Sequence, residues 1–492
     1  MLGAFLVRLH WNLLVHPLGD YVSSDMKGYV SRADQMIDKF GAPNEYHAFF
    51  PYGTHFILAL IKYLFGKDNF TAIGIAYALM GTGMVAYAYR IAARISPRKW
   101  VPPLLGTLLV FYYPLISLGG YTLSEIPFGV FMMASMFYLV RLVQEGRSRD
   151  AWLTGVTAAL ATACRPQILL SIALFGLIWL VWRKALPNVR WRHLVFAGIP
   201  LIAVLGFSAA RMHHHTGRIG LVSENGKFNQ LFGRCHNKKA TATPTEPGRG
   251  KIRFGPPPLI QLEKRAKTAP RSWVQLEPAL GPELDYRGYI ADAKALDALM
   301  AKCIRKTGFL GQVKYAIVNV LLLAGYNTPW PDSGRDMWRP RAIWWQGLYT
   351  TFVTLPVVLG LATLFMRRTI ANYGLIAMHV LALMITAAIY FGDTRLRAPY
   401  DPLLLLLALE VYVVVGTWLW RHGKTLWERR RARGPEASDR GVLRAMSSGT
   451  WPEVFTNSSR GGPASGARAR RRCRGRTPRG GRPGWRRSPA GR

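Results

Sequence analysis

Long apolar segments recur along this chain and constrain its fold more than any other feature. An α-helix needs about 20 apolar residues to cross the hydrocarbon layer of a bilayer. Half of the 492 residues are hydrophobic, and runs of this kind recur as far as residue 420. The sequence therefore predicts an all-α polytopic membrane protein with about ten transmembrane helices.

Clusters of Lys and Arg between the apolar runs predict the topology, because short loops rich in these residues face the cytoplasm. The clusters lie at residues 90–99, 141–149, 183–193, 367–368 and from 421 onward. Placing all five inside the cell predicts helices at about 1–18, 70–93, 100–118, 122–143, 151–167, 168–184, 193–212, 345–366, 370–391 and 399–420. The first is either a full transmembrane helix or one shortened by a misassigned start codon. A cleaved signal peptide is disfavoured, since no basic region precedes the apolar stretch.

Two apolar runs do not fit this topology. Residues 51–66, PYGTHFILALIKYLFG, form a short run that begins with Pro51 and contains Lys62, as is typical of a juxtamembrane helix lying at the interface. Residues 309–324 are placed at the outer surface by the same logic. The segments 19–50 and 213–308 then lie outside the cytoplasm, and the second is expected to be a sizeable outer loop domain with a helix near 289–305.

The four cysteines form no CxxC pair and no zinc-ligand spacing, so we expect neither a structural metal nor a cofactor. Cys235 and Cys303 both fall in the outer loop domain. In an oxidising compartment they could form a disulfide, and two buried thiols are the alternative.

Of the net charge of +38, +16 lies in residues 421–492, which hold 20 Lys and Arg against 4 Asp and Glu. Residues 421–492 are rich in Arg, Gly and Pro and have no periodic apolar face, so this segment is expected to be a disordered basic tail in the cytoplasm. Because so much of the charge lies in a tail, it is no argument for a nucleic-acid partner. The folded domain is expected to be residues 1–420.

Charged residues at the predicted helix ends collect on the outer side of the membrane. The arginines of FGDTRLRAPYDP, residues 391–402, stand out because a short outer loop should avoid Arg. Two partners are open for Arg395 and Arg397: a carboxylate in a structural ion pair, or a phosphate held by two hydrogen bonds. Carboxylates on the same face favour the second, since they add a base to a cation that stabilises an anionic leaving group. The charged residues on this face are Asp20, Asp25, Asp34, Glu125, Arg165, Asp393, Arg395 and Arg397.

Several motifs occur in an order that resembles a known superfamily. They are SSDMKGYVSRAD, FFPYGTHFILALIKYLFG, LSEIPF, TACRPQ, SENGKFNQLFGRCHN and FGDTRLRAPYDP. Together they resemble the GT-C membrane glycosyltransferases, in the branch of protein O-mannosyltransferases and aminoarabinose transferases, over residues 1–420. The resemblance implies an inner-membrane enzyme that transfers a sugar, a hexose or a pentose, from a polyprenyl-phosphate donor to an acceptor hydroxyl on the extracytoplasmic face, with inversion.

The resemblance also implies roles for individual residues. In the family an Asp in the first outer loop is the catalytic base, and Asp25 matches it, followed by Tyr29 at the family-like spacing. Many members carry an acidic residue directly after that Asp, whereas this chain has Met26, so Asp20 is a fallback base.

The other charged residues are expected to serve the two substrates. Arg395, Arg397 and Arg165 would bind the donor phosphate, while Glu125 and Asp393 would bind acceptor or orient an arginine. The acceptor is a glycan, a lipid or a protein.

Two other functions are compatible with parts of the pattern. A transporter or flippase of lipid-linked substrates should show paired half-repeats and ionisable groups near the membrane midplane, whereas the charges here gather at one face. A ligase of lipid-linked glycans would share the outer arginines and use the histidine-rich stretch that begins at His213.

Overall fold

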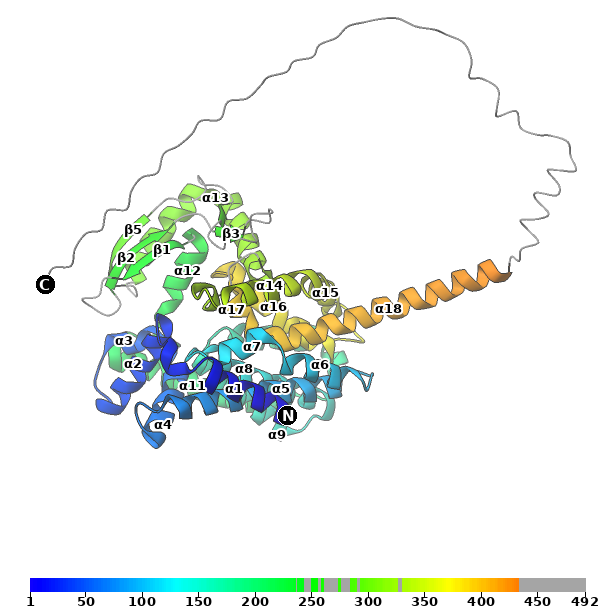
Figure 1. Ribbon diagram of the computed structural model, residues 1–492, viewed down its shortest axis with the longest axis horizontal. Coiled ribbons are helices and arrows are strands. Elements are labelled where there is room, and N and C mark those ends of the chain that lie inside the picture. The colour runs from blue at the N-terminus through cyan, green and yellow to red at the C-terminus, as the bar shows by residue number, and fades with distance from the viewer. Residues whose placement is uncertain are drawn as a thin grey trace, which may run out of the picture. The chain divides into compact units, whose positions relative to one another are not determined.

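The chain folds into a bundle of helices with a small segment of strands inserted near the middle of the sequence (Figure 1). The computed structural model describes residues 1–235, 237–242, 249–254, 258–260, 273–275, 284–289, 293–325 and 330–432. Its helices confirm the predicted helical class. Contacts divide the chain into two units, Met1–Trp420 and Arg421–Arg492. The predicted disordered tail spans residues 421–492; of these, 421–432 are helical, and 433–492 lie outside the described residues.

Every predicted transmembrane segment contains a helix, although several are shorter or bent. The helices of the bundle are α1 (Leu2–His10) with the π-helix Trp11–Val15, α5 (Phe70–Ile95), α6 (Val101–Val110), α7 (Tyr113–Gly119), α8 (Glu125–Glu145), α9 (Ser148–Cys164), α10 (Ile168–Val181), α11 (Trp191–Thr216), α14 (Arg339–Phe352), α15 (Thr354–Gly360), α16 (Tyr373–Ile389), α17 (Thr394–Arg397) and α18 (Asp401–Ala432). The first outer segment forms α2 (Asp25–Asp38), α3 (Glu45–Phe49) and α4 (Gly53–Phe65).

Length and composition identify the helices that could cross a membrane. Among the described residues, five single helices and two bent pairs are long and apolar enough. The bent pairs are α6 with α7, at 49°, and α14 with the helical segments that follow it, at 41°. Shorter apolar helices occur at Leu2–Val15, Gly53–Phe65, Ile168–Val181 and Tyr373–Ile389. A multi-pass membrane protein accounts for this set. The predicted spans 1–18, 168–184 and 370–391 contain only shorter apolar helices, and α9 is in neither group. The helix Ala293–Ala324 is among the five long ones, although its residues 309–324 are expected at the outer surface.

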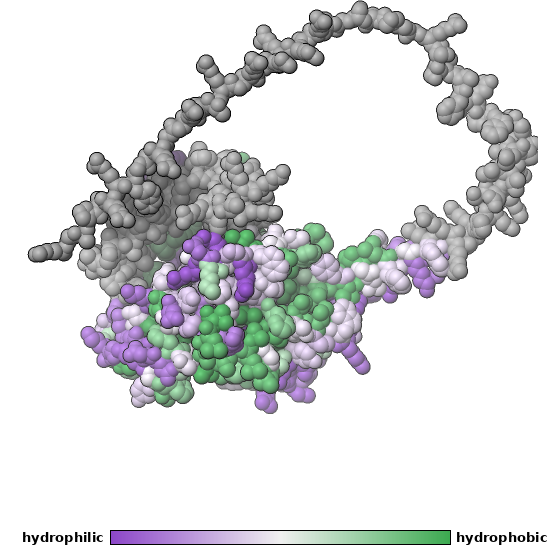
Figure 2. Space-filling model, viewed as in Figure 1, coloured by the Kyte–Doolittle hydropathy of each residue, from purple (hydrophilic) through white to green (hydrophobic). Residues whose placement is uncertain are grey.

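The surface of the bundle is apolar where a bilayer would cover it. Figure 2 shows hydrophobic side chains gathered across the middle of the face on which α1, α5 and α6 lie. Leu2, Leu6, Leu79, Leu104 and Leu108 are among the exposed large apolar residues of these helices. A continuous surface of this kind is stable only against lipid or another protein.

The helix α8 lies at the centre of the bundle. In the most apolar 18-residue stretch of α8, 78% of the residues are buried, whereas in that of α11 only 17% are. Met132, Met133 and Met136 are completely buried in the main core, together with residues of α5, α9, α16 and α18. Glu125 is the first residue of α8, so the helix places a carboxylate at the end of the core.

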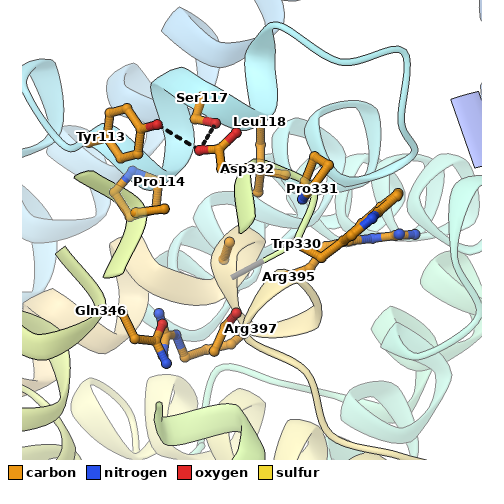
Figure 3. A pocket seen from close by; sticks show the side chains of 13 residues that line it. Tyr113, Pro114, Ser117, Leu118, Trp330, Pro331, Asp332, Gln346, Arg395 and Arg397 are labelled. Carbon is orange, nitrogen blue, oxygen red and sulfur yellow. Dashed lines mark hydrogen bonds between the residues drawn. The ribbon is translucent and has the colours of Figure 1, made fainter. Parts of the chain in front are cut away.

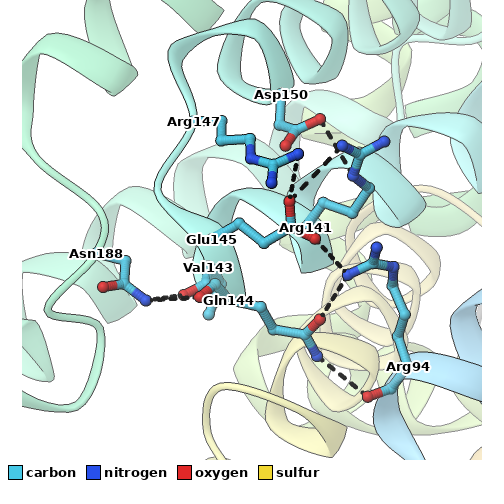
Figure 4. A network of polar contacts seen from close by, with 8 residues as sticks. All are labelled: Arg94, Arg141, Val143, Gln144, Glu145, Arg147, Asp150 and Asn188. Carbon is cyan, nitrogen blue, oxygen red and sulfur yellow. Dashed lines mark hydrogen bonds and ion pairs between the residues drawn. The ribbon is translucent and has the colours of Figure 1, made fainter.

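Polar residues tie together the end of the bundle opposite Glu125 (Figure 4). Glu145 at the end of α8 pairs with Arg94 at 2.7 Å and with Arg147 at 3.0 Å. Arg141 lies 3.3 Å from Asp150, the third residue of α9. These contacts join α5, α8 and α9, and they neutralise part of the basic clusters that predict this side to be cytoplasmic.

The segment predicted to lie outside the cytoplasm, which we call the outer segment, comprises α12 (Asn225–Cys235), α13 (Ala293–Ala324) and the strands between them and is a helix pair with two small sheets. The helices α12 and α13 pack together, and a disulfide joins Cys235 to Cys303, so the first of the two predicted alternatives is confirmed. The sequence did not indicate strands here. An antiparallel sheet has the order β1 (Asn237–Ala242), β2 (Arg249–Phe254), β5 (Leu284–Tyr289), and β3 (Pro258–Ile260) pairs with β4 (Trp273–Gln275).

The apolar run 309–324 follows a break at Gly308, a non-helical residue that divides α13 into two helical parts, so the predicted separation from the helix near 289–305 is confirmed. The predicted end of the last helix is wrong. The last helix does not end at residue 420 but continues to Ala432, where the spacing of Lys424 and Glu428 allows a pair at 3.8 Å on one helix face.

The packing of α9 against α11 gives a first prediction. A Cβ at Gly155 would lie 2.3 Å from the carbonyl oxygen of Ala197, whereas one at Gly198 would meet nothing within 4 Å. Gly155→Val should therefore separate the two helices and lower the free energy of unfolding by about 1–3 kcal/mol. Thermal unfolding in detergent measures this. The matched Gly198→Ala should be neutral or stabilising, and equal melting temperatures for the two variants would contradict the packing.

Candidate active site

The candidate base begins the helix α2, which follows a strained residue. Asp25 is the first residue of α2, and its side chain is 36% exposed. Ser24 before it has φ 50° and ψ −126°, a conformation that residues other than Gly rarely adopt. Strain of this kind costs about 1–3 kcal/mol and is concentrated at functional sites. The backbone conformation of Ser24 sets the direction in which the chain enters α2, and with it the position of Asp25.

Arg395 joins the base to the core of the bundle. Its Nη1 lies 3.0 Å from Oδ2 of Asp25, and its Nε donates to Oε1 of Glu125. The three residues come from α2, α8 and α17, so only the folded chain brings them together. This contact unites the first outer loop with the late arginine turn, as the resemblance implies.

Glu125 also binds a second cation. Arg165 follows the last residue of α9, and its Nη1 lies 2.9 Å from the same Oε1 of Glu125. The Glu125 side chain is fully buried, and a buried carboxylate without a cation would be costly. Together, Asp25 and Glu125 balance Arg165 and Arg395, so the cluster is neutral when all four are ionised. We call these four residues the charge cluster.

Two aromatic side chains enclose the charge cluster. The guanidinium of Arg395 lies 4.6 Å from the ring centre of Trp330, a distance typical of a cation–π contact. Tyr29, one turn after Asp25 on α2, is buried close to Glu125, and burial raises the pKa of its phenol to about 12.

Asp393 contacts the backbone of the arginine. It is the N-cap of α17, and its carboxylate accepts a hydrogen bond of 2.8 Å from the backbone N–H of Arg395. Burial raises the pKa of Asp393 to about 6, although this hydrogen bond and the charge of Arg395 oppose the shift. The orienting role of Asp393 stays a prediction.

Arg397 belongs to a different set of contacts. Its Nε lies 2.9 Å from Asp401, its Nη1 donates to the carbonyl oxygen of Leu323 at 2.7 Å, and its guanidinium lies 3.4 Å from the ring centre of Tyr349. Tyr112 donates to the other oxygen of Asp401 at 2.8 Å. The two arginines thus do not form one clamp in this structure. Arg395 faces Asp25, and Arg397 is held in a buried ion pair.

A small cavity separates the two arginines from the helix α7 (Figure 3). Its volume is about 40 Å³, which is room for a water molecule or two but not for a sugar ring. On its other side Arg395 contacts Asp25, the most exposed member of the charge cluster. The cavity is lined by Tyr113, Pro114, Ser117, Leu118, Trp330, Pro331, Asp332, Ala342, Gln346, Thr394, Arg395, Arg397 and Ala398.

Asp332 anchors the loop that carries Trp330, and sequence reasoning missed both. Its carboxylate accepts hydrogen bonds from Tyr113 at 2.7 Å, Ser117 at 2.6 Å and Tyr121 at 2.8 Å. Burial raises its pKa even though these hydroxyls oppose the shift. The signal was an aromatic residue and an acid in the short stretch WPD, but no spacing rule links that stretch to Arg395.

The fallback base is not part of the charge cluster. Asp20 lies on the 3₁₀-helix Leu18–Tyr21 with its side chain exposed, and within the described ranges it has no hydrogen bond or ion pair to the cluster. No group of three or more His, Cys, Asp or Glu that could hold a metal occurs among the described residues. The cluster offers one exposed carboxylate and two cations, which suits proton removal next to a developing negative charge.

Residues 35–211 match the model of the family described as dolichyl-phosphate-mannose-protein mannosyltransferase. The matched segment contains Glu125 and Arg165. The predicted resemblance to the GT-C superfamily is confirmed. No curated protein matches the sequence.

Solved structures of GT-C enzymes show some similarity to this chain. The oligosaccharyltransferase AglB from Archaeoglobus fulgidus, in complex with an inhibitory peptide and a dolichol-phosphate, is 12% identical with a TM-score of 0.44. The match covers 86% of this chain and 51% of AglB, so the chain spans about half of that protein. ArnT from Cupriavidus metallidurans, bound to undecaprenyl phosphate, is 14% identical with a TM-score of 0.35, covering 83% of this chain and 76% of ArnT.

The separation of the two arginines generates a second prediction. Arg397→Met should lower the free energy of unfolding by about 3 kcal/mol, because it leaves Asp401 buried without its cation. The double variant Arg397→Met/Asp401→Leu should regain most of that loss, since it removes both charges. Thermal unfolding in detergent compares the two. A double variant no more stable than the single one would show that the ion pair is not what Arg397 contributes.

Proposed function

We propose that this protein transfers a sugar, a hexose or a pentose, from a polyprenyl-phosphate donor to an acceptor hydroxyl, with inversion at the anomeric carbon. The observation that carries the proposal is the contact between Asp25 and Arg395 at 3.0 Å, which sets a partly exposed carboxylate beside a buried cation. The family match supports the class of reaction. The acceptor is a glycan, a lipid or a protein.

Asp25 acts as the general base in this reaction. The acceptor oxygen attacks the anomeric carbon, its proton passes to the Asp25 carboxylate, and the bond between that carbon and the phosphate oxygen breaks. The polyprenyl phosphate leaves with the electron pair. A direct displacement inverts the carbon and needs no second carboxylate as nucleophile.

Arg395 stabilises the leaving phosphate, with Arg165 adding positive charge next to it. A guanidinium binds a phosphate by two hydrogen bonds, and charge that develops in the transition state strengthens them. In the structure Asp25 occupies one side of Arg395. A donor phosphate would displace that carboxylate, which frees it to accept the acceptor proton.

Glu125 holds the two cations in place and can also contact a substrate. Its Oε1 binds Arg165 and Arg395, while its Oε2 is buried and has no hydrogen-bond partner within the described ranges. Buried polar atoms in folded proteins nearly always have a partner, so this oxygen suits a sugar hydroxyl. Tyr29 next to it would donate to the same ring.

The charge cluster would face the extracytoplasmic side of the inner membrane. The basic groups around Arg94, Arg141 and Arg147 lie at the opposite end of α5 and α8, and the positive-inside rule assigns that end to the cytoplasm. A polyprenyl-phosphate donor flipped to the outer leaflet would reach Arg395 from the lipid.

The choice between Asp25 and Asp20 gives a third prediction. Asp25→Asn should lower transfer from a radiolabelled polyprenyl-phosphate sugar by about 10²–10⁴-fold, because the amide cannot accept the proton. Donor binding should persist, since Arg395 and Arg165 are unchanged. Asp20→Asn is the matched control and should keep full activity. An active Asp25→Asn enzyme would rule out Asp25 as the base.

A further inference from the structure

An arginine of the outer segment binds the end of the helix that leads to Arg395. Arg234 on α12 donates from Nε to the carbonyl oxygen of Ile389 at 3.1 Å, and from Nη2 to the same oxygen at 2.9 Å. Its Nη2 also donates to the carbonyl oxygen of Ala388. Both carbonyls belong to the last turn of α16.

These contacts suit the chemistry of a helix C-terminus. The last carbonyl groups of a helix have no partner within it, and they carry the negative end of the helix dipole. A cation with several donors satisfies both conditions. Gln312 of α13 holds Arg234 in turn, because its Nε2 donates to the Arg234 carbonyl oxygen at 3.0 Å and its Oε1 accepts from Nη1 at 3.4 Å.

The outer segment and the end of α16 also touch through their backbones. A Cβ at Gly233 would lie 1.1 Å from the carbonyl oxygen of Tyr390, so no other residue fits there without separating the two. Asn319 of α13 donates to the carbonyl oxygens of Gly233 at 3.3 Å and Tyr390 at 3.4 Å. The disulfide from Cys235 to Cys303 ties the residue after Arg234 to α13.

The chain from this contact to the charge cluster is short. After Tyr390 come Phe391 and Gly392, and then Asp393 caps the turn in which Arg395 reaches Asp25. Phe391 packs on Phe232 of α12 with ring centres 5.9 Å apart. A shift of the α16 terminus would therefore move Arg395.

We propose that Arg234 is a positioning residue that holds Arg395 in register with Asp25, a role that rests on the proposed function of Arg395 in binding the donor phosphate. Arg234 acts through the end of α16 and not by touching substrate, since its contacts in the structure are with carbonyl and amide groups of the chain. The outer segment thereby determines the geometry of the site.

The experiment uses the full-length protein in nanodiscs with farnesyl phosphate as the probe. Arg234→Gln should weaken farnesyl phosphate binding about tenfold, the size of effect usual for coupled neighbours. Arg234→Lys should restore part of it, because an ammonium still binds one carbonyl. The matched control is Lys227→Gln: Lys227 pairs with Asp297 at 2.8 Å and so joins α12 to α13 without touching α16, and its loss should change nothing.

A double-mutant cycle separates positioning from general loss of stability. If Arg234 acts through Arg395, Arg234→Gln should have no further effect on binding in the Arg395→Gln background. An equal loss in both backgrounds, or wild-type affinity in Arg234→Gln, would overturn the proposal.

Hydrogen exchange supplies a readout that does not depend on the enzymatic function. Arg234→Gln should speed amide exchange in the peptide covering residues 388–397, and Lys227→Gln should not. Unchanged exchange in Arg234→Gln would also overturn the positioning role. If the wild-type protein failed to bind farnesyl phosphate while exchange responded as expected, the proposed function would fail and the positioning of this turn would stand.

Discussion

The buried carboxylate of Glu125 is the constraint on which the arrangement of the site depends. It lies at the start of the central helix α8, where an unpaired charge would cost several kcal/mol. One oxygen of this carboxylate accepts both Arg165 and Arg395, so the ends of α9 and α17 must converge on α8. Asp25 then joins from the first outer segment through Arg395. Segments of α2, α8, α9 and α17 meet because a buried carboxylate requires a cation as its partner.

The helical framework was predictable because its cause is local. A run such as the one in α5 must form its backbone hydrogen bonds internally in lipid, and so it forms a helix wherever it lies in the chain. The two bent pairs were not predicted as such, because hydropathy measures apolar length and not direction. Pro114 at the start of α7 was the one local sign of the first break. The strands near Ile252 lie in a stretch rich in Gly and Pro and without the alternation that marks a strand.

The members of the site were predictable as types of residue, but their pairing was not. Arg395 and Arg397 were predicted as site residues because a short outer loop should avoid Arg, and the sequence offers no reason to give the two different roles. In the structure the two arginines have different partners, because Asp401, one helical turn after Arg397, forms an ion pair with Arg397. That i,i+4 spacing is visible in the sequence. The position of Trp330 is not, since it depends on three hydroxyl groups that bind Asp332, two of them on α7 and the third on Tyr121 just after it.

The strained backbone at Ser24 means that stability and activity place opposite demands on this position. Glycine adopts its φ of 50° and ψ of −126° at little cost, so a glycine here would relieve the strain and favour the folded state. The same change would loosen the loop from which Asp25 projects toward Arg395. Glycine at position 24 would therefore stabilise the folded chain and at the same time widen the range of positions that Asp25 can take relative to Arg395.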